Sequence, residues 1–231
     1  MKNRPRHGLF ITGTGTGVGK SYVAALIARR LVATGNRVGV YKPVASGCRR
    51  LGTELIADDA QLLWEAAGRP GALDNVCPQR FEASLAPHLA ARQEGRAIDT
   101  DLIRDGICDW SDRCDIVLVE GAGGLMSPLS DDDYNVTLAE EFAYPLVIVA
   151  VNQLGVINQT LQTLIAAASY GDDIPIAGVI LNNIAPQADH SVESNRCELE
   201  ARCVPPILAE LKFNATEFTS DVDWANIATA I

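Results

Sequence analysis

"GLFITGTGTGVGKS", residues 8–21, is the stretch that decides the fold of this chain. It opens with an apolar run that is typical of a strand buried on both faces of a parallel sheet. Glycine and threonine then alternate until Lys20 and Ser21 begin a helical pattern. A glycine-rich turn between a strand and a helix directs backbone N–H groups at one concavity, where a phosphate binds. We predict that Lys20 reaches the β- and γ-phosphates of a nucleotide and that Ser21 ligates Mg²⁺.

Further apolar runs rich in β-branched residues cover 37–44, 115–121, 145–152 and 176–183. Helical patterns lie between them, among them 21–35, which ends on Gly35, and 157–171. This alternation predicts a doubly wound α/β fold of the P-loop NTPase kind, in which helices flank a mainly parallel sheet. Residues 48–110 are interpreted as a mostly helical insertion, and the pattern weakens after about residue 186.

The composition predicts one domain over residues 1–231. A net charge of −10 argues against nucleic acid as a partner. No apolar stretch is long enough to span a membrane, and no apolar run of a signal peptide follows the basic N-terminus. None of the six cysteines lies in a C-x-x-C pair, so we interpret them as small buried apolar side chains of a cytoplasmic protein.

Charged side chains follow two of the predicted strands. Glu120 is the first charge after the apolar part of 115–121, so it emerges at the carboxyl edge of the sheet, where ligands bind. We interpret it as the acidic partner of a metal; the alternative is a carboxylate that only ends a strand. Lys42 ends 37–44 at the same edge and either neutralises a phosphorylated intermediate or is an ordinary surface lysine. Asp58 and Asp59 open a helix, and their position alone favours an N-cap.

Two further stretches suggest ligand contacts. Residues 152–159 begin a helix whose free N–H groups suit a carboxylate. Asn182 and Asn183 end the last clear strand, where an amide can read a base edge through paired hydrogen bonds.

Together these motifs resemble the dethiobiotin synthetase family. Besides the phosphate loop, the resemblance rests on "YKPVASG" (41–47), "DDAQLL" (58–63), "QEGRAI" (93–98), "VLVEGAGGLMSPLSD" (117–131), "LGVINQTLQT" (154–163) and "GVILNN" (178–183). It extends from about residue 8 to about residue 186. The family implies an ATP- and Mg²⁺-dependent ligase of biotin biosynthesis that acts as a homodimer.

The resemblance assigns roles to individual residues. It implies that the cofactor ATP is held by Gly17, Val18, Gly19, Lys20, Ser21, Tyr22, Gly121, Ala122, Gly123 and Asn182, the last of these facing adenine. It places Mg²⁺ among Ser21, Asp59 and Glu120, and so prefers Asp59 to Asp58. Lys42 and Lys20 become the catalytic cations, and Ser46 a substrate contact. Segment 154–158, with Gly155, Val156, Ile157 and Asn158, reaches the substrate carboxylate in the neighbouring subunit.

The family's reaction closes a ring. The substrate 7,8-diaminopelargonate takes up CO₂ as a carbamate, ATP phosphorylates that carbamate, and the second amine closes a cyclic urea. A partitioning-type P-loop ATPase is an alternative, but such proteins carry a second lysine early in the loop, where this chain has Gly15. An amidotransferase-type synthetase needs a glutaminase domain for which 231 residues leave no room. A paralogue that binds nucleotide without synthetase turnover is the third alternative.

Overall fold

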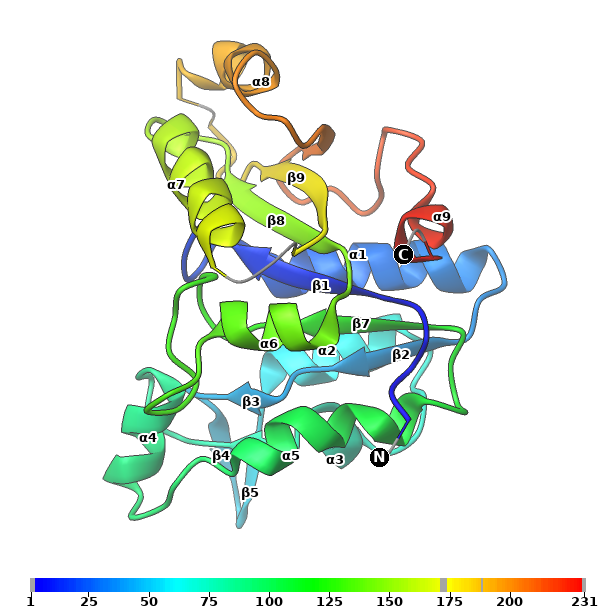
Figure 1. The fold of residues 1–231 in the computed structure, drawn as a ribbon, viewed down its shortest axis with the longest axis vertical. Helices are drawn as coiled ribbons and strands as arrows, with labels where there is room; N and C mark the ends of the chain where they lie inside the picture. Colours follow the sequence, from blue (N-terminus) through cyan, green and yellow to red (C-terminus); the bar gives the residue numbers. More distant parts are fainter. Residues whose placement is uncertain (1–2, 171–173, 188, 230–231) are drawn as a thin grey trace.

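A parallel sheet organises the computed structural model, which describes residues 3–170, 174–187 and 189–229 (Figure 1). In the described chain its strand order is β10-β9-β8-β1-β7-β2. The strands are β1 Gly8–Gly13, β2 Val38–Tyr41, β7 Ile116–Glu120, β8 Leu146–Val151, β9 Ile176–Asn182 and β10 Ile207–Leu211. All adjacent pairs run parallel, which confirms the predicted doubly wound sheet.

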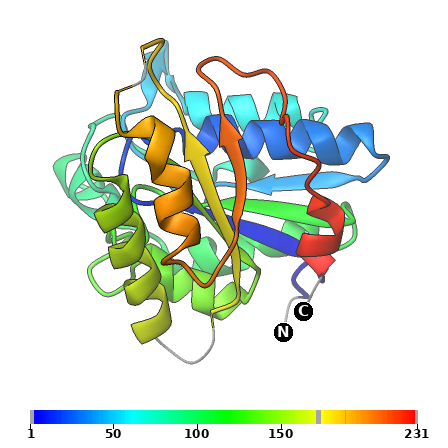
Figure 2. The ribbon, with the colours of Figure 1, turned by 90° about the horizontal axis from the view of Figure 1, so that it is seen from above.

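Helices cover both faces of the sheet. Helices α1 (Lys20–Ala33) and α2 (Asp58–Ala66) lie on one face, and α6 (Asn135–Phe142) and α7 (Val156–Ser169) lie on the other (Figures 1 and 2). The predicted end of the first helix is confirmed, because Gly35 has φ +90° and its N–H donates to Val32. Of the helix predicted over 157–171, Gly171 lies outside the described residues. No helix in the described ranges is both long and apolar enough to cross a membrane.

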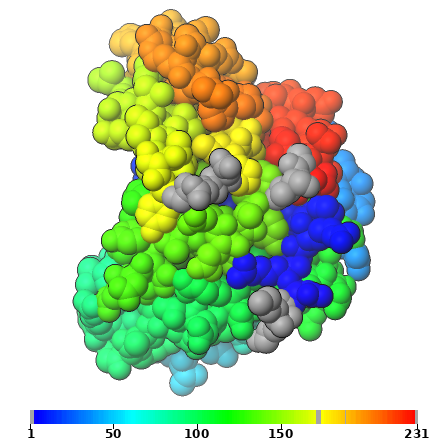
Figure 3. Space-filling model, in the orientation of Figure 1, coloured from blue at the N-terminus to red at the C-terminus, as the bar shows by residue number. Residues whose placement is uncertain are grey.

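The insertion between β2 and β7 is mostly helical, as predicted, and forms one end of the molecule in the space-filling view (Figure 3). Its remaining helices are α3 Leu73–Val76, α4 Pro87–Gln93, α5 Thr100–Asp105 and the 3₁₀ helix η1 Gly106–Trp110. Its short strands are β3 Val44–Ala45, paired with β6 Gln79–Arg80, and the hairpin of β4 Arg49–Leu51 with β5 Glu54–Ile56. The sequence did not predict β4, β5 and β6, because two or three residues show no periodicity.

The segment after residue 186 is more ordered than its pattern suggested. It forms α8 (Val192–Glu200), α9 (Trp224–Thr229) and β10, which extends the main sheet beside β9. Strand β10 was missed because its five residues directly follow the breaker "VPP" (204–206) in a stretch without a clear pattern. The prediction for the cysteines holds for Cys48, Cys77 and Cys114, which are buried, whereas Cys197 is exposed.

Tyr41 attaches the insertion to the sheet. Its side chain is fully buried at the end of β2, and its hydroxyl oxygen is 2.9 Å from the carbonyl oxygens of both Leu102 and Ile103 in α5. Burial raises the pKa of Tyr41, so the phenol stays protonated and donates to these carbonyls.

We expect Tyr41→Phe to lower the free energy of unfolding by about 1–2 kcal/mol, because the carbonyls of Leu102 and Ile103 lose the hydroxyl donor that they share. Urea unfolding measures this change, with the slope unaltered. Tyr170→Phe is the control: the Tyr170 hydroxyl is 3.0 Å from the half-buried Thr137 hydroxyl, so a smaller loss is expected. Equal losses in the two variants would show that Tyr41 does not anchor α5.

Candidate active site

The loop between β1 and α1 has the geometry of a phosphate site. Gly17 and Gly19 have φ values of +75° and +91°, which side-chain-bearing residues rarely adopt. Gly19 is the N-cap of α1, and no side chain caps this helix, so its first N–H groups are available to an anion. The Lys20 side chain is buried and its Nζ lies 3.2 Å from the Gly15 carbonyl oxygen. Burial lowers the pKa of Lys20, and the nearby Glu120 opposes this shift.

A cleft of about 390 Å³ opens beside this loop, at the carboxyl ends of the adjacent strands β1, β7 and β2. The predicted residues that line it are Gly17, Gly19, Lys20, Ser21, Tyr22, Lys42, Ser46, Asp59, Glu120, Ala122 and Gly123. Thr16, Ala45 and Leu62 also line it and were not predicted. Thr16 and Ala45 adjoin the predicted residues Gly17 and Ser46, and Leu62 lies one turn after Asp59 in α2. Only this nearness to predicted residues could have identified them from the sequence.

A buried ion pair forms the floor of the cleft. The side chains of Lys42 and Glu120 are 5% and 1% exposed, and Lys42 Nζ lies 2.5 Å from Glu120 Oε1. Lys42 Nζ also lies 3.2 Å from Oδ2 of Asp59. Burial by itself lowers the pKa of Lys42, but the two carboxylates outweigh it and hold that pKa above its usual value. Lys42 is therefore a fixed cation, which excludes the ordinary surface lysine considered from the sequence.

The oxygen atoms around this pair fit Mg²⁺. Ser21 donates its hydroxyl to Glu120 Oε1 at 2.8 Å, while Glu120 Oε2 is buried and has no hydrogen-bond partner among the described residues. Such an orphaned carboxylate oxygen is expected where a cation binds. The described ranges hold no cluster of three or more His, Cys, Asp or Glu side chains suited to a metal. Mg²⁺ in phosphoryl-transfer sites needs only one or two carboxylates besides phosphate.

The two aspartates at the start of α2 have different partners. Ala57 is the N-cap and no side chain caps the helix, so the N-cap interpretation of Asp58 and Asp59 is wrong. Asp58 pairs with Arg49 on the protein surface, whereas Asp59 faces Lys42 in the cleft. The structure thus brings Asp59, and not Asp58, to the other predicted metal ligands.

Three predicted residues lie behind the cleft wall. Asn182 is 2% exposed and donates through Nδ2 to the Val18 carbonyl oxygen at 3.0 Å. A Cβ atom on Gly19 would lie 2.2 Å from the same nitrogen, so Asn182 packs directly under the phosphate loop. A contact of Asn182 with adenine stays a prediction. Val18 is buried, and Gly121 faces the side chain of Asn135.

The segment Gly155, Val156, Ile157 and Asn158 does not line this cleft. It begins α7, where Gly155 has φ +98°. The nearby N–H groups are not all free as predicted, because Leu154 donates to Asp189 Oδ2 at 2.7 Å and Val156 to the Gln153 carbonyl at 3.0 Å. A carboxylate does bind at this turn, but it belongs to the chain itself.

Sheet order, phosphate loop and cation-lined cleft together define a P-loop nucleotide-binding protein. Solved structures with the same fold include a ParA family ATPase from Chlorobium tepidum, with a TM-score of 0.56 and 18% identity over 92% of this chain and 86% of that one. The MinC:MinD cell division complex of Aquifex aeolicus gives a TM-score of 0.53 and 17% identity, over 97% and 86% of the chains. At these identities the likeness shows the fold alone.

Sequence relatives identify the family. A family model described as an AAA domain matches residues 7–216. The ATP-dependent dethiobiotin synthetase BioD of Rhodopirellula baltica is 46% identical in an alignment of 214 positions that covers 88% of this chain and 83% of that protein. Those of Anaeromyxobacter dehalogenans and Bacillus cereus are 40% and 36% identical, over 83% and 93% of this chain and 83% and 86% of theirs. The chain therefore belongs to the dethiobiotin synthetase family of ligases.

The buried pair generates a test of stability. Glu120→Gln should lower the free energy of unfolding at pH 7 by about 3–5 kcal/mol, because Lys42 becomes a buried cation without its main partner. In the wild type the pKa of Lys42 is higher in the folded state than in the unfolded state. The ion pair therefore contributes its full stabilisation at pH values below the pKa of the unfolded state, and this stabilisation is lost only as pH rises through the pKa of the folded state. In the variant, we expect burial to lower the pKa of Lys42 below its value in the unfolded state, so the free energy of unfolding increases as pH rises.

The stability gap between the wild type and Glu120→Gln is thus expected to narrow from pH 7 to pH 9.5, as measured by urea unfolding. The double variant Lys42→Met/Glu120→Gln lacks the buried cation at position 42 and serves as the control, with a stability gap to the wild type that does not narrow. If the difference in unfolding free energy between the wild type and Glu120→Gln stays constant or widens with pH, the assignment of Lys42 and Glu120 as a buried ion pair is contradicted.

Proposed function

We propose that this protein catalyses the ATP- and Mg²⁺-dependent carboxylation and ring closure of 7,8-diaminopelargonate to dethiobiotin. The observation that carries the proposal is the fixed cation Lys42, held by Glu120 and Asp59 beside the phosphate loop, in a chain whose relatives are named ATP-dependent dethiobiotin synthetases. A permanently charged lysine suits a reaction that gathers negative charge on a carbamate and three phosphate groups.

The proposed reaction needs positioning more than covalent catalysis. One amine of the substrate adds CO₂ and forms a carbamate. A carbamate oxygen attacks the γ-phosphorus of ATP, and the bond from that phosphorus to the bridging oxygen breaks as ADP leaves. The second amine attacks the carbamate carbon and loses a proton, the bond from that carbon to the phosphate oxygen breaks, and the urea ring closes as inorganic phosphate leaves. The chain contributes Lys20 and Lys42 as cations around the transferred group and the α1 N-terminus as a donor of N–H groups.

Ser21, Asp59 and Glu120 would hold Mg²⁺, since all three present oxygen atoms to the same part of the cleft. The ion supplies neutralisation of phosphate charge when it is bound. Lys42 pairs with both carboxylates in the free protein, so the buried Glu120 has a cationic partner there without the ion. Ser46 lines the cleft next to Ala45 and is proposed as a substrate contact.

We also propose a homodimer in which residues 154–158 contact the substrate of the neighbouring subunit. What supports this is that these residues lie at the start of α7 and away from the cleft of their own chain. Leu154 is 81% exposed there.

Two alternative functions were considered from the sequence. A partitioning ATPase is supported only by likeness of fold, whereas a paralogue without turnover is excluded only by an activity measurement.

Replacing the cation tests the reaction. Purified protein is incubated with Mg-ATP, bicarbonate and 7,8-diaminopelargonate, and dethiobiotin and ADP are quantified by mass spectrometry. We expect equal amounts of both from the wild type, and a fall in kcat of about 10²–10³-fold in Lys42→Ala, because the transition state loses one fixed cation. ADP without dethiobiotin would indicate another acceptor, and no turnover at all would favour the paralogue.

The metal site is tested by the two neighbouring aspartates. Asp59→Asn should raise the Mg²⁺ concentration for half-maximal activity about tenfold or more, because one of the proposed oxygen ligands loses its charge. Asp58→Asn is the matched control, one residue away in the same helical turn and paired with Arg49. An equal Mg²⁺ requirement in both variants would remove Asp59 from the metal site.

A further inference from the structure

Asn135 is a buried side chain with no assigned role that touches one wall of the cleft. It is the first residue of α6 and is completely inaccessible to solvent. Its Oδ1 accepts a hydrogen bond from the Ala122 N–H at 3.0 Å. Its Nδ2 donates to the carbonyl oxygens of Ala122 at 2.7 Å and Gly124 at 2.8 Å, with that of Ser127 at 3.3 Å. One amide thus binds the loop after Glu120 at three residues.

The glycines of this loop fit around the amide. A Cβ atom on Gly121 would lie 2.6 Å from Asn135 Oδ1, so any larger residue would displace the side chain. Gly123 has φ +83°, and a Cβ atom there would lie 2.5 Å from the Ser127 hydroxyl oxygen. That oxygen accepts the Gly124 N–H at 2.9 Å. The "GAGG" stretch is therefore shaped by Asn135 and Ser127, in addition to any ligand.

The same loop touches the phosphate loop. A Cβ atom on Gly124 would lie 3.3 Å from both the Gly13 carbonyl oxygen and Gly15 Cα, which places the two backbones in direct contact. Ala122 and Gly123 line the cleft together with Lys20 and Glu120. A displacement of residues 122–124 would therefore move one wall of the cleft and press on the other.

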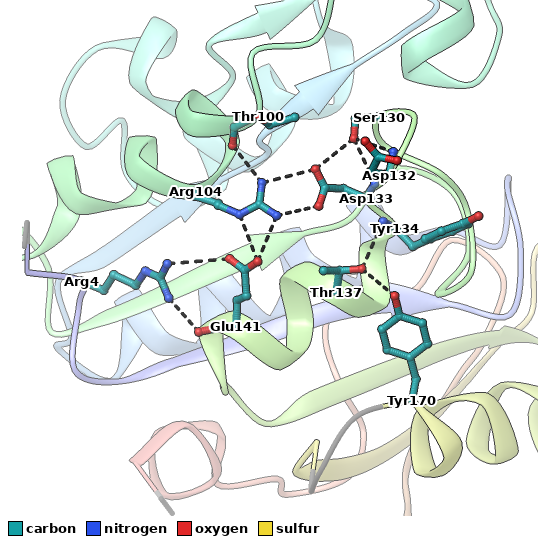
Figure 4. Close-up of polar contacts among 10 residues, drawn as sticks. All are labelled: Arg4, Thr100, Arg104, Ser130, Asp132, Asp133, Tyr134, Thr137, Glu141 and Tyr170. Atoms are coloured by element: carbon teal, nitrogen blue, oxygen red, sulfur yellow. Dashed lines mark hydrogen bonds and ion pairs between the residues drawn. The ribbon is translucent and has the colours of Figure 1, made fainter.

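The residues on both sides of Asn135 in the chain are held by ion pairs. The Arg104 guanidinium on α5 pairs with Asp133 at 2.6 Å and with Glu141 on α6 at 3.0 Å (Figure 4). The Ser130 hydroxyl donates to Asp133 at 2.9 Å (Figure 4). The first N–H groups of α6 bind the loop as well, because Asn135 N–H donates to the Ser127 carbonyl. The start of α6 is thus a fixed base for the amide.

We infer that Asn135 is a positioning residue for catalysis: its amide fixes the backbone at residues 122–124 where the phosphates and the carbamate are to be aligned. The inference rests on the proposed function, because a reaction of this kind depends on placement. All groups of the amide match a donor or acceptor of the loop. An aspartate of the same shape would aim an oxygen at carbonyl oxygens instead of a donor, and the loop would shift.

The experiment compares Asn135→Asp, Asn135→Ala and Gln79→Glu with the wild type. Gln79 is the matched control, because it is also a buried amide (4% exposed) that binds backbone, donating to the Asp99 carbonyl and accepting from the Asp99 N–H. Hydrogen exchange of peptides covering 121–128 reports the loop without any need for activity. The kcat per folded enzyme is measured at saturating ATP, and thermal unfolding gives the folded fraction.

We expect at least tenfold faster exchange of the Ala122 and Gly124 amides and a 10- to 100-fold lower kcat in both Asn135 variants. In Gln79→Glu both quantities should stay within twofold of the wild type, although its stability falls. Exchange that is unchanged in the Asn135 variants, or a kcat within twofold of the wild type, overturns the inference.

If the Asn135→Asp and Asn135→Ala variants do not fold, Asn135→Ser replaces them, since it keeps a small polar side chain at the start of α6 but removes the amide. The same two outcomes then apply. Failure of the proposed function is distinguishable, because a wild type that makes no dethiobiotin still has an exchange rate at residues 121–128. In that case, faster exchange together with weaker ATP binding in Asn135→Asp supports the inference. If exchange and ATP binding are both unchanged in that variant, the inference is overturned.

Discussion

The ion pair of Lys42 and Glu120 is the constraint on which the site depends. A charge buried this deeply is destabilising unless it is paired with the opposite charge. The ends of β2 and β7 must therefore keep the register that places Lys42 next to Glu120. Neighbouring parallel strands provide this, because the carboxyl ends of β1, β7 and β2 meet at one edge. The phosphate loop leaves β1 at the same edge. Sheet order therefore brings Lys20, Lys42 and Glu120 into one cleft.

Around this pair the site is built from backbone more than from side chains. The phosphate loop is supported from below by Asn182, and the loop after Glu120 is held by Asn135. Both asparagines are buried, and both form hydrogen bonds with main-chain groups of these loops. Glycine at positions 19 and 121 permits these close approaches. Preorganised backbone lowers the cost of aligning a charged ligand, which suits a reaction that depends on placement.

The sequence predicted the parts whose signal is local. Strands β1, β7 and β8 are near-continuous apolar runs, and the phosphate loop is a contiguous motif. Edge strand β10 gave no such signal, because its five residues directly follow two prolines at 205 and 206. Asp58 and Asp59 are adjacent at a helix start, so their position alone did not separate them; the family resemblance preferred Asp59, which is the one that packs against Lys42. The contacts of Asn135 cross up to 13 residues and involve main-chain atoms, which no side-chain pattern reveals.

The central claim is that this cleft transfers the γ-phosphoryl group of ATP to an oxygen of the carbamate. It is tested most directly with freshly dissolved ¹⁸O-labelled bicarbonate, Mg-ATP and 7,8-diaminopelargonate, and mass analysis of the inorganic phosphate that forms alongside dethiobiotin. The account predicts phosphate that carries an ¹⁸O atom from bicarbonate for each dethiobiotin formed. Unlabelled phosphate, formed in step with dethiobiotin, would show that ATP is cleaved by water and would contradict it.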